Sequence, residues 1–136
     1  MNLRFSKQDK NRLKTLGVVA LYLFGSRAQG LAGPLSDYDF AVLMKEPGQK
    51  RGGEVYNQLY EILSPLCPRT LKNDIIDIIF LRDTQLELRF HVIRYGKVLF
   101  DAQPLRRLRF EVETQLLYND YRPILDMFDK AILATI

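Results

Sequence analysis

The sequence predicts an α/β fold of the α+β type, in which helices flank a small mixed sheet. Continuous apolar and β-branched runs, which are typical of buried strands, alternate with segments of helical periodicity. The chain has 136 residues, of which 47% are hydrophobic and 26% charged. This composition is typical of a globular domain with its own core. No repeat or interdomain linker divides the chain, so we expect one domain over residues 1–136.

Turn and cap signals delimit the elements of the N-terminal half. Ser6 followed three residues later by Asp9 predicts a helix start, and Gly17 predicts its end. The run from Val18 to Phe24 is apolar throughout and predicts a strand buried on both faces. The expected elements are, in order, a helix over 7–16, a strand over 18–24, a glycine-rich loop over 25–36, a strand over 38–44, a flexible connection over 46–53 and a helix over 54–63.

The C-terminal half predicts one further strand, an edge strand and long C-terminal helices. Thr84 is expected to cap the first helix, and Pro123 is expected to bend or divide the last one. The expected elements are a strand over 74–81, a helix over 84–94, an edge strand over 97–100, and helical segments over 104–123 and 124–136. We expect residues 1–103 to form a catalytic core and residues 104–136 to form a helical element that packs on it or binds a partner.

Single residues of the C-terminal half support the same division. One apolar stripe marks the long helix, and it consists of Leu105, Leu108, Val112 and Leu116. Tyr118 and Tyr121 on the same helix suit either core packing or a partner interface, and core packing is favoured.

Charge and composition exclude several function classes. The net charge of +4 is a mild bias. The basic cluster at 106–109 lacks the interleaved aromatic residues of single-strand binders, so direct binding of nucleic acid is not expected. The longest apolar run is too short to span a membrane. Cys67 is the only cysteine and His91 the only histidine, which excludes an internal disulfide and a site built from several histidines. A reducing cytoplasm is the expected location.

Two short motifs predict a site for a metal-bound triphosphate. Gly25-Ser26 follows a buried strand, where glycine lets phosphate approach the backbone and the serine hydroxyl adds a donor. Arg27 either contacts phosphate or faces solvent. Asp37 and Asp39 follow ten residues later, two apart on a strand, so they point to the same face. Paired carboxylates suit Mg²⁺, which binds through one or two carboxylates together with substrate phosphates.

A third acid would complete a site for two metal ions. The next strand offers Asp74 and Asp77, which are three apart and therefore lie on opposite faces. Asp74 stands at the strand's start, as Asp37 does on its own strand, and is the favoured candidate. Asp77 remains the alternative. The pattern as a whole predicts nucleotidyl transfer, in which an acceptor oxygen attacks the α-phosphorus of a nucleoside triphosphate and pyrophosphate leaves.

These residues resemble the minimal nucleotidyltransferase family of the DNA polymerase β superfamily. The resemblance rests on the Gly-Ser motif, the Asp-x-Asp motif ten residues later and the acids of the third strand. It extends to residues 95–100 and to two stretches of the C-terminal helix, 110–111 and 117–123. Gln29-Gly30 departs from the Arg-Gly pair often found in the family's loop, which removes one possible phosphate contact.

The resemblance implies an antitoxin paired with a helical HEPN ribonuclease toxin. Such proteins transfer AMP from ATP to a tyrosine of the toxin. It also implies that Gly25, Ser26 and Arg27 bind the nucleotide and that Asp37, Asp39 and Asp74 bind Mg²⁺, with two ions expected. A hetero-oligomer without membrane contact follows. Two alternatives stay open, a non-catalytic antitoxin that masks its toxin and a nucleotidyltransferase that modifies a small molecule.

Overall fold

A four-stranded mixed sheet forms the centre of the protein. The structure, a computed structural model, describes residues 3–30, 37–67 and 76–135. The strand order is β3-β2-β1-β4; β1 runs antiparallel to β2 and β4, and β3 runs parallel to β2. The strands are β1 (Val18–Phe24), β2 (Tyr38–Met44), β3 (Ile76–Phe80) and β4 (Lys97–Asp101). The predicted mixed sheet is confirmed, with the predicted edge strand as β4.

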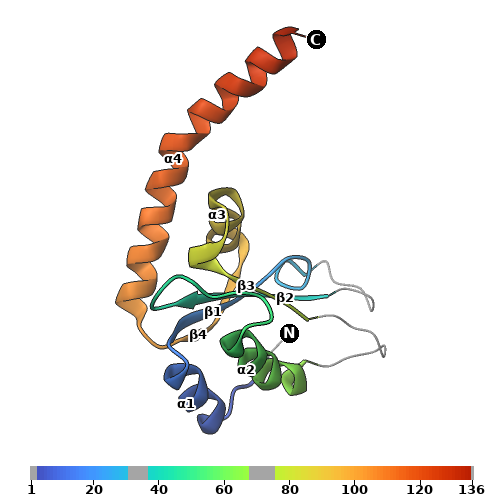
Figure 1. Ribbon diagram of the computed structural model, residues 1–136, viewed down its shortest axis with the longest axis vertical. Helices are drawn as coiled ribbons and strands as arrows, with labels where there is room; N and C mark the ends of the chain where they lie inside the picture. The colour runs from blue at the N-terminus through green and yellow to red at the C-terminus, as the bar shows by residue number, and fades with distance from the viewer. Residues whose placement is uncertain (1–2, 31–36, 68–75, 136) are drawn as a thin grey trace.

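Helices cover both faces of this sheet (Figure 1). One face packs against α1 (Lys7–Thr15) and α2 (Glu54–Leu63), and the other against α3 (Leu86–Tyr95) and α4 (Pro104–Thr135). The strands therefore divide their apolar side chains between two buried clusters. Phe40 and Val42 belong to the cluster under α1 and α2, whereas Ala41 and Leu43 belong to the cluster under α3 and α4. The continuous apolar runs of β1 and β2 follow from burial on both faces.

Helix starts agree with the sequence at α1 but differ at α3. Ser6 and Asp9 form the predicted capping box, in which each side chain accepts a hydrogen bond from the other's backbone N–H. The prediction that Thr84 caps α3 is wrong. The N-cap residue is Gln85, and the Thr84 hydroxyl instead donates to the carbonyl oxygen of Phe80 at 2.6 Å.

The C-terminal element is one helix rather than several. α4 has 32 residues and passes through Pro123 without ending. Its axis changes direction along its length, and its second half extends beyond the rest of the protein (Figure 1). The predicted stripe is mostly exposed, because the side chains buried against the body are Phe110 and Thr114. The four exposed stripe residues are Leu105, Leu108, Val112 and Leu116.

A network of charges fixes the first half of α4 to the sheet. Arg107 donates to a carboxylate oxygen of Asp101 on β4 at 2.7 Å and to one of Glu111 on α4 at 2.7 Å. These side chains are about four-fifths buried, so solvent screens the pairs weakly. The Tyr22 hydroxyl of β1 lies beside this network, and burial, with the Glu111 carboxylate adding to it, raises the pKa of Tyr22 above its ordinary value.

Within the described ranges, no helix combines the length and the apolar character that crossing a membrane requires.

Candidate active site

The Gly25-Ser26 turn begins where β1 ends. Gly25 has φ +75°, a backbone conformation that favours glycine. A Cβ at this position would also collide with the Oδ2 atom of Asp39. The backbone N–H groups of Ala28 and Gln29 both donate to the Gly25 carbonyl, so the residues after Gly25 form one helix-like turn. The chain therefore brings bare backbone against a carboxylate, an approach that any side chain at position 25 would block.

The turn also places Arg27 beside the start of β2. Its guanidinium carbon lies 3.9 Å above the centre of the Tyr38 ring. Tyr38 is fully buried, whereas Ser26 and Arg27 are each partly exposed. Tyr38 stands between Asp37 and Asp39 in the sequence, but its side chain points to the opposite face of the sheet from Asp39.

Three carboxylates approach one another at the beginning of β2 and β3. Asp37 is exposed and directly precedes β2, and Asp39 is half-buried within it. In the parallel pairing of the two strands, Asp39 lies opposite Asp77. Burial raises the pKa of the Asp39 carboxyl, and the negative charges of Asp77 and Asp37 raise it further. A group under this pressure gains from a bound cation.

The register between β2 and β3 bears on the choice of a third acid. Residues paired across two strands lie on the same face, so Asp77 shares the face of Asp39. This is the face covered by α3 and α4, since the neighbouring Tyr38 and Phe40 point to the other one. Asp74, the favoured candidate from the sequence, lies outside the described residues.

Arg51 is a component of the site that the sequence did not reveal. Its guanidinium lies 3.4 Å from the Oδ1 atom of Asp77. It belongs to the connection between β2 and α2, which is anchored near its start because the N–H groups of Gly48 and Gln49 donate to the Asp83 carboxylate. Arg51 and Asp77 are 26 residues apart, and no local pattern marks such a contact.

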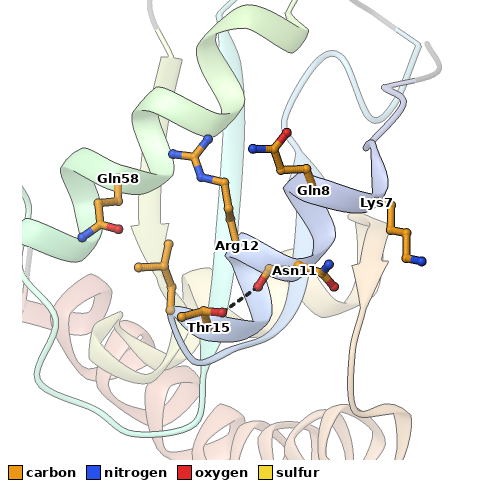
Figure 2. Close-up of a pocket in the computed structure, with 7 residues that line it drawn as sticks. Lys7, Gln8, Asn11, Arg12, Thr15 and Gln58 are labelled. Carbon is orange, nitrogen blue, oxygen red and sulfur yellow. Dashed lines mark hydrogen bonds between the residues drawn. The ribbon is translucent and has the colours of Figure 1, made fainter.

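A hollow between α1 and α2 lies on the opposite side of the sheet (Figure 2). It measures about 470 Å³, and the Thr15 hydroxyl at its wall donates to the Asn11 carbonyl at 2.9 Å. Its lining consists of Lys7, Gln8, Asn11, Arg12, Thr15, Leu16 and Gln58. None of these is a carboxylate, so this hollow is not the candidate site for a metal.

Comparison with known proteins decides the family. Residues 7–105 match the model of a family described as polymerase beta, nucleotidyltransferase. The chain belongs to this nucleotidyltransferase family. The match ends at the second residue of α4, so nearly all of that helix lies beyond it. No curated protein matches the sequence significantly.

Solved structures of toxin–antitoxin complexes share the fold of this nucleotidyltransferase. A chain of one such complex, crystallised with AMP-PNP, is 27% identical, with a TM-score of 0.59 over 88% of this chain and 97% of that chain. A chain of an MntA–HepT mutant complex is 26% identical, with a TM-score of 0.60 over 92% and 98%. A third matching chain belongs to the complex of a tri-AMPylated HEPN toxin of Shewanella oneidensis with an MNT antitoxin. It is 24% identical, with a TM-score of 0.53 over 90% of this chain and 97% of that chain, and it shows a shared fold.

The carboxylates of this nucleotidyltransferase have the right chemistry to bind a hard divalent cation, but their side chains are not arranged as a ready site for one. All the candidate donors are carboxylate oxygens, which suit Mg²⁺. Over residues 3–30, 37–67 and 76–135, no three or more His, Cys, Asp or Glu side chains are arranged as a ready metal site. Mg²⁺ usually keeps several water ligands and binds through one or two carboxylates together with substrate phosphates. The donor set therefore suits an ion that arrives with its nucleotide.

Proposed function

We propose that this nucleotidyltransferase is a Mg²⁺-dependent antitoxin that transfers AMP from ATP to a tyrosine of a HEPN ribonuclease toxin. The observation that carries the proposal is the close approach of the Gly25 backbone to Asp39, with Asp77 opposite Asp39 on the neighbouring strand. One wall of the site can then receive phosphates while the other holds cations. The complexes named above, which contain an ATP analogue in one case and an AMPylated toxin in another, support the choice of ATP and of a protein acceptor.

Each residue of the site has a separate role in the proposed reaction. Asp37 and Asp39 are the metal ligands, and we assign the third acid to Asp77 because of its register with Asp39. Bound there, Mg²⁺ would neutralise the carboxylates and the triphosphate and favour attack on the α-phosphorus. Ser26 and the adjacent backbone N–H groups donate to the phosphates, and Arg27 adds positive charge.

The transfer balances without a further reactant. The phenolic oxygen of the acceptor tyrosine forms a bond to the α-phosphorus, and the bond from that phosphorus to the bridging oxygen breaks. Pyrophosphate leaves with the bonding electrons, and the phenolic proton passes to a nearby base or to water.

A second candidate is an antitoxin that acts by masking, because α4 exposes apolar side chains such as Leu117 and Phe128 that a partner could cover. The two functions differ in their dependence on the carboxylates. Masking survives loss of Asp37 and Asp39, whereas AMP transfer does not.

The experiment uses the protein encoded beside this chain as the acceptor. The two proteins are incubated with Mg²⁺ and ATP labelled at the α-phosphate, and the label on the acceptor is measured. We expect labelling by the wild type and none by Asp37→Ala with Asp39→Ala. A wild-type chain that binds Mg²⁺ and ATP but labels no acceptor would exclude the transfer. Neutralisation of the toxin by the double variant would establish masking.

A further inference from the structure

One face of α4 changes from buried to exposed along the helix. In the first half, Phe110 is 5% exposed and Thr114 is 1% exposed, because both pack against the body of the protein. The same face continues at intervals of three or four residues, the spacing that keeps side chains on one side of a helix. Its four next members, here called the distal stripe, are exposed by 53%, 40%, 48% and 63%, and they are Leu117, Tyr121, Ile124 and Phe128.

The distal stripe is large enough to be half of a stable interface. With Ile132, which lies on the same side and is 58% exposed, its exposed surface amounts to roughly 500 Å² if each large side chain has about 200 Å². Interfaces are about 60% apolar. An interface centred on the stripe therefore buries on the order of 800 Å² on this side, which is the usual size for a specific complex.

The shape of this surface favours a helix as its occupant. The second half of α4 extends beyond the body, so a partner can reach the stripe along its length (Figure 1). A row of side chains at alternating intervals of three and four residues is the kind of surface that packs against another helix. The first half of the same face is already buried at Phe110 and Thr114, and beside it Phe90 of α3 stacks on Tyr118 of α4 with ring centres 3.8 Å apart.

Charge on one side of the stripe bears on the choice between another protein and a second copy of this chain. At 3.6 residues per turn, Asp120 is the charged residue nearest to that side. Arg122 and Asp129 are seven residues apart, so they lie together on the other side, where their charges offset each other. Two antiparallel copies paired through the stripe would set the Asp120 side of one against the Asp120 side of the other. A helix with Lys or Arg beside its apolar residues would instead form an ion pair with Asp120.

We infer that the distal stripe docks a helix of the partner protein that presents apolar residues with a Lys or Arg beside them, opposite Asp120. The existence of that partner rests on the proposed function. The stripe lies beyond the family match, which ends at residue 105. In this arrangement α4 would bind the partner, and the domain that the family shares would catalyse the transfer.

The test is the complex with the protein encoded beside this chain, co-expressed and purified, with its dissociation constant measured. Ile124→Asp combined with Phe128→Asp places charge in the stripe, and we expect at least a hundredfold weaker complex. Leu133→Asp is the matched control, because Leu133 is 71% exposed and lies nine residues from Ile124, on the opposite side of the helix. Asp120→Lys should also weaken the complex. Hydrogen exchange should show protection of residues 117–132 on binding.

Four outcomes would overturn the inference. They are an unchanged complex with the stripe variant, equal weakening by Leu133→Asp, a tighter complex with the lysine variant, and a dimer of the isolated chain that the stripe variant dissociates. Circular dichroism shows whether each variant keeps its helices. A complex that forms normally but receives no AMP would exclude the proposed transfer and leave the docking inference standing. A chain that binds Mg²⁺ and ATP but forms no complex would exclude the docking inference and leave the proposed nucleotidyl transfer standing.

Discussion

Gly25→Ala separates the backbone requirement of the turn from its role in the site. Gly25 has φ +75°, and an alanine Cβ there would lie 3.3 Å from Asp39 Cγ and would collide with the Oδ2 atom. The substitution therefore acts on the fold through its backbone and on the site through the displaced carboxylate. Gly30 is the matched control, since it has φ +72° and a Cβ there would meet nothing within 4 Å.

The two effects differ in size. An alanine in this left-handed conformation loses about 1–2 kcal/mol, offset by about 0.4–1 kcal/mol from the reduced freedom of the unfolded chain. Each variant should therefore lose about 1 kcal/mol of stability, a fall in Tm of about 4 °C for a domain of this length. In Gly25→Ala the Asp39 carboxylate must also move by on the order of 1 Å, and a displacement of about that size lowers activity about a hundredfold.

Urea unfolding gives the stability of each variant, and titration with Mg²⁺ and ATP gives the affinity. We expect Gly25→Ala and Gly30→Ala to lose similar stability, and only Gly25→Ala to lose affinity for Mg²⁺ and ATP. Normal affinity in Gly25→Ala, or equal loss of affinity in Gly30→Ala, would refute the assignment of the Gly25–Asp39 contact to the site.

Three further variants test the charges around the site and under α4. Asp39→Asn should raise the Tm at neutral pH, because a carboxyl with a raised pKa destabilises the fold once it is ionised. The gain in Tm over the wild type should shrink as the pH falls through the pKa of that carboxyl. A gain that stays constant with pH would contradict this. Arg51→Ala should tighten Mn²⁺ binding several-fold in the absence of nucleotide, because the guanidinium competes with the cation for Asp77. Lys50→Ala on the same loop is the control and should change the affinity for Mn²⁺ less. Equal effects of the two substitutions would argue against the ion pair. Arg107→Met should lower the free energy of unfolding in urea by about 2–3 kcal/mol, because it leaves two largely buried carboxylates without their hydrogen-bond donor. A loss below about 0.5 kcal/mol would contradict a stabilising role of the network.

The sequence predicted the strands well because their signal is local. The apolar run from Val18 to Phe24 is buried along its whole length and forms β1 with those bounds. The third acid is a different kind of problem. Alternation along a strand separates Asp74 from Asp77 by face, but the face that meets Asp39 depends on the register between two strands, which is a property of the folded sheet. The contact of Arg51 with Asp77 is non-local for the same reason.

The long helix shows a second limit of local patterns. Periodicity in residues 104–135 predicts a helix correctly, but several apolar faces compete for the body of the protein. Leu108 and Val112 belong to the stripe that the sequence emphasised, yet 48% and 57% of their surface is exposed. Tyr121 was expected in the core and is 40% exposed. The face of α4 that is covered depends on the position of α3 and on ion pairs such as that of Arg107 with Asp101 of β4. The periodicity of the helix alone reveals neither of them.

We propose that the Asp37–Asp39 site transfers AMP to a protein partner. The most direct test is the intact mass of the protein encoded beside this chain, purified after co-expression with the wild type and with Asp37→Ala and Asp39→Ala combined. We predict that the partner from the wild-type culture is heavier by one or more AMP groups and that the partner from the variant culture is unmodified. A partner of unmodified mass in both cultures, recovered in a stable complex with the wild type, would contradict the transfer.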